Sequence, residues 1–183
     1  MDQPKPRKLT YEEIQAAKVK SGNEALRPRM PVVAVLDDIR SLQNVGAIFR
    51  TADGVHLEKL FLCGITGKPP RNEIRKTSLG AEESIPWEYA KDPLPVIHRL
   101  REQGYSIVAL EHTTASLDYR QASYRFPLCL IVGHEFHGIR DELVAEADLA
   151  VEIHMRGVKQ SLNVAVAFGV AAYQILSQWE QKK

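Results

Sequence analysis

Hydrophobic residues in the central part of the chain form short runs that alternate with mixed polar and apolar stretches. The runs rich in Val, Ile and Leu predict strands at residues 32–36, 60–63, 85–89, 107–110, 128–132 and 149–153. The stretches between them predict helices at residues 45–52, 73–83, 94–103 and 141–147. Since these strands lack period-two patterning, the sequence predicts an α/β fold whose mostly parallel sheet has helices on both faces.

The most apolar segment, residues 161–176, predicts one further helix that starts at Ser161. A helix that is apolar on nearly every side is buried on nearly every side. This one is too short and too interrupted to span a bilayer. Ser161 is a favourable N-cap, and exposed amides at a helix start attract electron-rich ligand atoms. By itself, the pattern fits a capped core helix as well as a binding site.

Residues 1–30 form a basic extension before the main domain, which we place at residues 31–178. Thr10 and Glu13 predict a capped short helix, and the pattern ends near residues 21–23. Basic side chains are enriched here and in a second cluster; they are Lys5, Arg7, Lys8, Lys18, Lys20, Arg27, Arg29 and then Arg71, Arg75, Lys76. A net charge of +1 does not imply a strongly basic nucleic-acid binder, so these residues are either a solvated surface or local phosphate contacts.

Length and composition fit one cytoplasmic domain. The 183 residues, 44% of them hydrophobic, can bury a sizeable core. The start of the chain lacks an apolar signal-peptide region, and no apolar run is long enough for a membrane span. Cys63 and Cys129 lie in predicted strands, where we expect buried free thiols of a reducing compartment, although a disulfide stays open.

Three polar motifs are placed on this frame. Residues 44–50 read Asn-Val-Gly-Ala-Ile-Phe-Arg, and residues 133–139 read Gly-His-Glu-Phe-His-Gly-Ile. Residues 153–157, Ile-His-Met-Arg-Gly, precede Ser-Leu-Asn-Val at 161–164. In this order they resemble the signature motifs of the SpoU (TrmH-like) branch of the SPOUT RNA methyltransferases, from about residue 31 to 176. His134 and His154 differ from the residues that are most common in these motifs, which are a small or amide residue at position 134 and a proline at position 154.

The resemblance implies an RNA ribose 2′-O-methyltransferase that uses S-adenosylmethionine. It implies a deep C-terminal trefoil knot that holds the cofactor, and a homodimer with the active site at its interface. The cofactor positions that it carries over are Leu110, Gly133, Ile153 and Leu162. The catalytic position is Arg50, with Asn44, Glu135, Ser161 and Asn163 as its polar support.

The chemistry of these residues leaves alternatives open. A guanidinium, with a pKa above about 12, rarely gives up its proton. We therefore interpret Arg50, on the helical face above a turn at Gly46, as orienting a phosphate and stabilising a developing 2′-oxyanion, against the plainer interpretation of a salt bridge. Glu135 could instead be a structural carboxylate that accepts backbone amides. Gly133 and Gly138 fit either close approach to a ligand or a plain turn.

Two other classes of function remain in competition. His134, Glu135 and His137, with His112 or His154, could form a metal site, but the spacing is not that of a known zinc motif and a metal-dependent hydrolase is disfavoured. A non-catalytic RNA-binding module would not need both an arginine site and a cofactor cradle. Among RNA substrates we favour tRNA over rRNA, because the chain lacks room for a separate N-terminal RNA-recognition domain.

Overall fold

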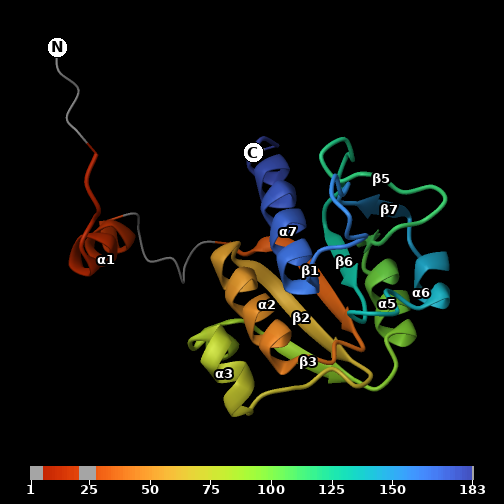
Figure 1. The fold of residues 1–183 in the computed structure, drawn as a ribbon, viewed down its shortest axis with the longest axis horizontal. Coiled ribbons are helices and arrows are strands. Elements are labelled where there is room, and N and C mark those ends of the chain that lie inside the picture. The colour runs from red at the N-terminus through yellow and green to blue at the C-terminus, as the bar shows by residue number, and fades with distance from the viewer. Residues whose placement is uncertain (1–5, 21–27, 183) are drawn as a thin grey trace.

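The computed structural model describes residues 6–20 and 28–182 and contains one seven-stranded sheet (Figure 1). The strands are β1 (Met30–Asp37), β2 (Leu57–Cys63), β3 (Trp87–Ala90), β4 (Ser106–Leu110), β5 (Leu117–Asp118), β6 (Leu128–Val132) and β7 (Leu149–Glu152). Their order is β3-β2-β1-β6-β4-β7-β5, and every neighbouring pair is parallel. The predicted fold class is confirmed, and the family comparison below supports it.

The described helices are α1 (Tyr11–Lys20), α2 (Leu42–Gly54), α3 (Asn72–Ser78), α4 (Ala81–Ser84), α5 (Leu94–Glu102), α6 (Asp141–Ala145) and α7 (Val164–Glu180). Helices of the segment from α2 to α7 cover both faces of the sheet. One apolar cluster lies between the sheet and α2, α3 and α7, and a second lies between the sheet and α5 and α6. Successive residues of β1 alternate between the clusters: Val32 enters the first and Val33 the second. Burial on both faces explains why the strands read as continuous apolar runs.

Two predicted helices differ from the structure, and one strand was not predicted. The helix expected at 73–83 is two helices, because Leu79 and Gly80 take left-handed backbone conformations, with φ of 52° and 94°. Strand β5 was missed, since two residues carry no readable pattern. The last helix begins at Val164 rather than Ser161, because Asn163 is its N-cap.

The N-terminal helix agrees with its predicted capping box. The Glu13 amide donates to Thr10 Oγ1 at 3.3 Å, and the Thr10 amide donates to the Glu13 carboxylate at 2.8 Å. The predicted end of this pattern near residues 21–23 lies outside the described residues. The domain boundary at residue 31 and the C-terminal knot stay predictions.

Both cysteines are buried and free, as expected. Burial raises the pKa of Cys63 to about 12, and burial also raises the pKa of Cys129, so both thiols are protonated at neutral pH. None of the helices in the described part of the chain has the length and apolar character needed to cross a membrane.

Helix α7 is only partly buried, so the prediction of burial on nearly every side is wrong for the single chain. Phe168, Ala171, Ala172 and Ile175 are buried. Val166 and Tyr173, by contrast, are 52% and 54% exposed. At its other end the helix is held by the connection before β6, where Gln178 donates to the Ala122 carbonyl at 2.8 Å. One apolar side of α7 is therefore left uncovered.

Candidate active site

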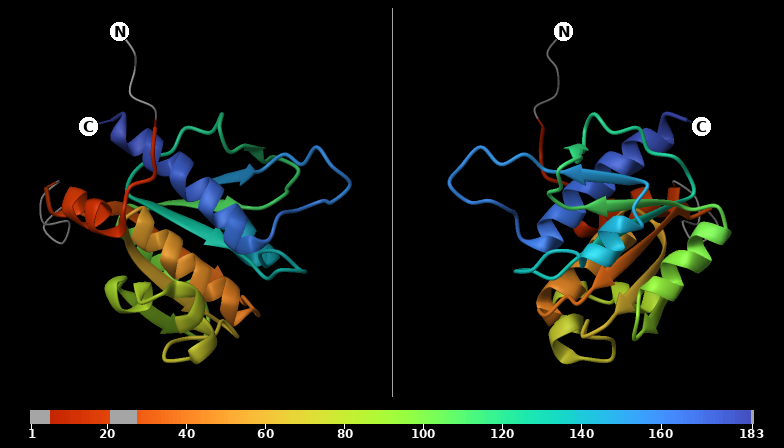
Figure 2. Two further views of the ribbon diagram at one scale, coloured as in Figure 1. Left: turned by 60° about the vertical axis from the view of Figure 1, so that its left-hand side comes forward. Right: turned by 90° about the vertical axis from the view of Figure 1, so that its right-hand side faces the viewer.

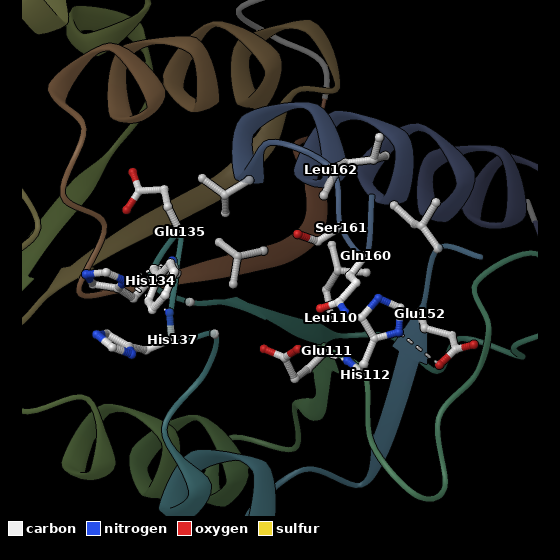
Figure 3. A pocket seen from close by; sticks show the side chains of 17 residues that line it. Leu110, Glu111, His112, His134, Glu135, His137, Glu152, Gln160, Ser161 and Leu162 are labelled. Carbon is white, nitrogen blue, oxygen red and sulfur yellow. Dashed lines mark hydrogen bonds and ion pairs between the residues drawn. The ribbon is translucent and has the colours of Figure 1, made fainter. Parts of the chain in front are cut away.

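A cavity of about 270 Å³ lies at the carboxyl ends of β4, β6 and β7 (Figure 3). Its walls are the ends of these strands, the loop of residues 133–138 and the segment just before α7. Figure 2 shows the connection between β7 and α7 extending away from the sheet before the chain returns to the helix. Parallel α/β sheets bind ligands at this edge. The lining includes all four residues carried over as cofactor positions: Leu110, Gly133, Ile153 and Leu162.

The lining combines apolar surface with negative charge. Leu110, Val132 and Leu162 supply apolar contacts, and Glu111, Glu135 and Glu152 supply carboxylates. The cavity lining includes neither Lys nor Arg. Such a site suits a ligand that joins an apolar ring to a positive charge, since the carboxylates attract a cation.

Two of these carboxylates were not identified from the sequence. Glu111 accepts hydrogen bonds from the Ile139 and His112 amides, both at 2.9 Å. Glu152 accepts a hydrogen bond from Ser116 Oγ at 2.6 Å and lies 3.3 Å from His112 Nδ1, and these contacts hold the pKa of Glu152 below its usual range. Each residue ends or directly follows a strand, and this position at the ligand-binding edge is the signal that could have found them.

Glu135, Asn44 and Asn163 join all three motifs in one chain of hydrogen bonds. The Glu135 carboxylate accepts from the Arg40 and Ser41 amides at 3.0 and 2.9 Å and from Asn44 Nδ2 at 2.8 Å. Asn163 Nδ2 donates to Asn44 Oδ1 at 3.0 Å. Burial acts to raise the pKa of Glu135, but the Ser41 and Arg40 amides and the Asn44 side chain outweigh it and hold that pKa below its ordinary value.

The start of α7 is fixed by the same network. Asn163 Oδ1 accepts from the Ala165 amide at 2.9 Å and so caps the helix, the role that the sequence had suggested for Ser161. Ser161 is instead an exposed residue of the cavity lining. One asparagine therefore positions the helix and contacts Asn44, while the serine hydroxyl faces the cavity region.

The two glycines of the 133–138 loop are needed for a tight turn. A Cβ on Gly133 would overlap the Gly138 carbonyl, and one on Gly138 would overlap the Glu111 carboxylate. Gly138 also has a φ of 72°. The structure thus supports the turn interpretation of these glycines, although both still line the cavity.

The histidines do not gather into one cluster. His134 Nδ1 accepts the Phe136 and His137 amides at 3.0 and 3.2 Å, an acceptor role that an amide side chain can also fill. His112 lies at the opposite end of the cavity, beside Glu152 (Figure 3). Within residues 6–20 and 28–182, no group of three or more His, Cys, Asp and Glu residues could hold a metal ion.

Arg50 is separated from this network. It is exposed on α2 and does not line the cavity, about 9 Å along the helix axis from Asn44. Its side chain forms no hydrogen bond or ion pair with another described residue, and the nearby Asp53 instead accepts from Ser84 at 2.6 Å. Gly46 lies within α2, in agreement with the helix predicted at residues 45–52, and a Cβ there would overlap Thr77 Oγ1 of α3.

An ion pair between the half-buried Arg140 and a buried carboxylate, also missed from the sequence, ties the end of the 133–139 loop to β1. Asp37 ends β1 and is fully buried, and its carboxylate accepts from Arg140 Nη2 at 2.7 Å and from Nε at 3.0 Å. This pairing raises the pKa of Arg140. Two-point contact fixes the guanidinium in orientation as well as position.

The predicted phosphate-binding cluster is exposed on α3, which packs beside α2. Arg71, Arg75 and Lys76 are all exposed, at or near the helix that contacts Gly46 through Thr77. The cluster and Arg50 therefore belong to neighbouring helices on the same side of the sheet.

Comparison with known proteins places these features in a family. The model of the SpoU rRNA Methylase family matches residues 31–173. The chain is 31% identical over 166 residues to the tRNA (guanosine(18)-2′-O)-methyltransferase of Aquifex aeolicus, covering 90% of this chain and 78% of the relative. It is 31% identical over 156 residues to the enzyme of the same name from Thermus thermophilus, covering 85% and 79%.

Solved structures agree with the sequence match. The TrmH/SpoU tRNA modifying enzyme of A. aeolicus superimposes with a TM-score of 0.80 at 30% identity, over 92% of this chain and 86% of that one. An AdoMet-bound rRNA methyltransferase from Sinorhizobium meliloti superimposes with a TM-score of 0.73 at 30% identity, over 79% and 55%.

Proposed function

Because the chain belongs to the SpoU rRNA methylase family, we propose that it transfers a methyl group from S-adenosylmethionine to a ribose 2′-hydroxyl of transfer RNA. The observation that carries the proposal is the joining of all three family motifs at one cavity, through the contacts of Glu135, Asn44 and Asn163. The A. aeolicus and T. thermophilus relatives, named for methylation of guanosine 18 of tRNA, support the substrate.

The cavity fits S-adenosylmethionine. Leu110, Ile153 and Leu162 would contact the adenine, and the carboxylates of Glu111 and Glu152 would lie near hydroxyl and ammonium groups. Bound there, the cofactor supplies an electrophilic methyl group on a positively charged sulfur. The negative lining favours that charge, and the related AdoMet-bound S. meliloti structure supports the assignment.

The acceptor side of the reaction falls to the polar network and Arg50. The ribose 2′-oxygen forms the new bond to the methyl carbon, the carbon–sulfur bond breaks, and the hydroxyl proton passes to solvent. Asn44, Glu135 and Asn163 hold the starts of α2 and α7 in place around this point, and Ser161 lies in the cavity lining beside them. Arg50 orients a backbone phosphate and stabilises the developing oxyanion.

We infer that the working unit is a homodimer. Arg50 does not line the cavity of its own chain, so a second copy is the candidate to bring this residue to it. The exposed Val166 and Tyr173 on α7 leave apolar surface of the kind that subunit contacts cover. Light scattering should give about twice the 20.6 kDa chain mass.

The RNA contacts and the location follow from the same assignment. The basic extension at residues 1–30 and the Arg71, Arg75 and Lys76 cluster would contact phosphates, which needs local positive charge only. A tRNA substrate and the two free cysteines support a cytoplasmic location.

Mass spectrometry of tRNA and rRNA nucleosides from cells with and without the protein tests the proposal. We expect loss of one 2′-O-methylated nucleoside from tRNA, with guanosine 18 the first position to examine. Loss from rRNA alone would show that the protein carries out the same reaction on ribosomal RNA. Calorimetry with S-adenosylmethionine and S-adenosylhomocysteine should show binding without added metal; binding that depends on zinc would favour the hydrolase.

A further inference from the structure

The loop of residues 133–139 holds an aromatic side chain in solvent at the edge of the cavity. Phe136 is 83% exposed. Its ring meets the His137 ring edge-on, with centroids 5.1 Å apart, and the His137 ring lies 4.7 Å from that of His134. A single exposed apolar side chain is ordinary on a protein surface, so exposure alone assigns no role to Phe136. The role is indicated by the fixed backbone that carries this ring and by its location at the cavity.

The backbone that carries Phe136 is fixed from several directions. His134 and Gly138 exchange reciprocal amide–carbonyl hydrogen bonds of 3.0 and 2.9 Å. The Phe136 amide itself donates to His134 Nδ1 at 3.0 Å, and the neighbouring Glu135 is bound to the start of α2. Because the backbone of this loop is already fixed, a ligand that contacts Phe136 does not have to order the loop.

The same loop forms one wall of the proposed cofactor cavity. Every residue from Gly133 to Gly138 is part of the lining, Phe136 included. In Figure 3 the side chains of His134, Glu135 and His137 gather at one end of the cavity, opposite His112 and Glu152. A ribose that accepts a methyl group from a cofactor in this cavity must lie at the cavity opening. The base attached to that ribose would then lie near the 133–138 loop.

A nucleobase is the ligand that such a surface fits. Bases stack on aromatic rings with little dependence on sequence, and unstacked bases are the usual partners of exposed aromatic side chains in RNA recognition. Resting on the proposed methyl transfer, we propose that Phe136 stacks on the base of the methylated nucleotide, with His137 against the edge of its ring and His134 bound to its backbone amide. Phe136 is then a positioning residue for the substrate: it lies at the exposed edge of the lining and is not one of the four positions assigned to the cofactor.

Removal of the ring should weaken substrate use without affecting the cofactor. We expect Phe136→Ala to lower kcat/KM for tRNA about 10- to 100-fold, mainly through KM, which is the range contributed by one base–aromatic stack. Phe136→Trp should retain most of the activity. The dissociation constant for S-adenosylmethionine and the mass by light scattering should not change. Leu117→Ala, which trims an exposed apolar residue of β5, is the matched control and should behave as the wild type.

An RNA that lacks the base at the methylated position tests the assigned partner. The wild type should lose about the same factor on this abasic tRNA as it loses through Phe136→Ala, and the variant should lose no more. If the losses in kcat/KM from Phe136→Ala and from the missing base multiplied, Phe136 would contact a different group. If Phe136→Ala had a reduced mass by light scattering, Phe136 would be a subunit contact. Either result overturns the proposal. A wild-type protein that binds S-adenosylmethionine but methylates no RNA would reject the proposed function itself.

Discussion

The cavity wall differs from the outer face of α2 and α7 in how many of its side chains have partners within the chain. Around the cavity, Glu135 has three donors, Asn163 bonds both Asn44 and the start of α7, and Asp37 is fully paired. On the outer face, Arg50 has no partner among the described residues and Tyr173 is 54% exposed. One chain therefore assembles the cavity and the polar network beside it, and leaves Arg50 and Tyr173 on the outer face of α2 and α7 exposed.

This difference corresponds to the two requirements of methyl transfer, which are a fixed methyl donor and a bound RNA acceptor. The donor has to be held in one geometry, and a network that is already folded does so without further loss of entropy when the RNA binds. The acceptor is a large polyanion, which is bound by side chains that no internal acid neutralises. Variants at the cavity wall should consequently change stability and cofactor binding. Variants on the outer face should change RNA binding and the rate of methyl transfer.

The largest effect should come from the ion pair behind the cavity. Arg140→Leu leaves the fully buried Asp37 carboxylate without its partner, and breaking such a pair costs about 3 kcal/mol. We expect urea unfolding to report that loss, together with weaker binding of S-adenosylmethionine by calorimetry.

The double variant Asp37→Asn/Arg140→Leu is the matched control, because removing both charges avoids an unpaired buried carboxylate. It should recover a large part of the stability. If Arg140→Leu unfolded at the wild-type urea concentration, the cavity wall would not depend on this pair.

The opposite result is expected on the outer face. Arg50→Lys keeps the charge and loses the planar fork, and we expect the single-turnover rate of methyl transfer to fall at least about 100-fold at saturating RNA and cofactor. Stability and cofactor affinity should be unchanged, since Arg50 contacts neither the network nor the cavity lining.

Two outcomes would contradict this role. Near-normal turnover would reduce Arg50 to a general phosphate contact, and loss of cofactor binding together with activity would make it structural. Mixed dimers of Arg50→Lys with Arg140→Leu then test the shared site: if Arg50 acts across the interface, one intact site forms in each mixed dimer and activity returns in part.

The same contrast explains how far the sequence could lead. Strand β6 was predicted to the residue, because its apolar run is bounded by Pro127 and Gly133. The cavity residues Gly133 and Leu162 were placed through the family motifs. The Asp37–Arg140 pair spans 103 residues of sequence, and no local pattern contains both partners. Asn163 replaced Ser161 as the cap because the choice depends on a contact with α2 that only the folded chain makes.

A smaller effect, on tRNA binding, is expected from the basic residues of α3, which lies beside α2. Arg75→Ala should weaken tRNA binding a few-fold and reduce the slope of affinity against salt by about 0.7–0.9, as expected for one lost phosphate contact. The cofactor affinity should not change. Arg99→Ala, on α5 beneath the other face of the sheet, is the control and should keep the wild-type slope. Equal slopes for all three proteins would assign Arg75 to the solvated surface.

The smallest effect concerns the pH dependence of the polar network. The folded pKa of Glu135 lies below its ordinary value of 4.5, so its contribution to stability is fully present above that value and is lost as the pH falls through the folded pKa. Glu135 is exposed, and solvent screening limits the contribution to less than about 1 kcal/mol. Glu135→Gln cannot ionise, and we therefore expect its melting temperature to fall less steeply than that of the wild type below about pH 5. Glu102→Gln, at an exposed carboxylate on α5, should follow the wild-type curve. Parallel curves for Glu135→Gln and the wild type would mean that the amides of Arg40 and Ser41 are satisfied equally well by a neutral side chain, and that the charge of Glu135 does not stabilise the junction of the motifs.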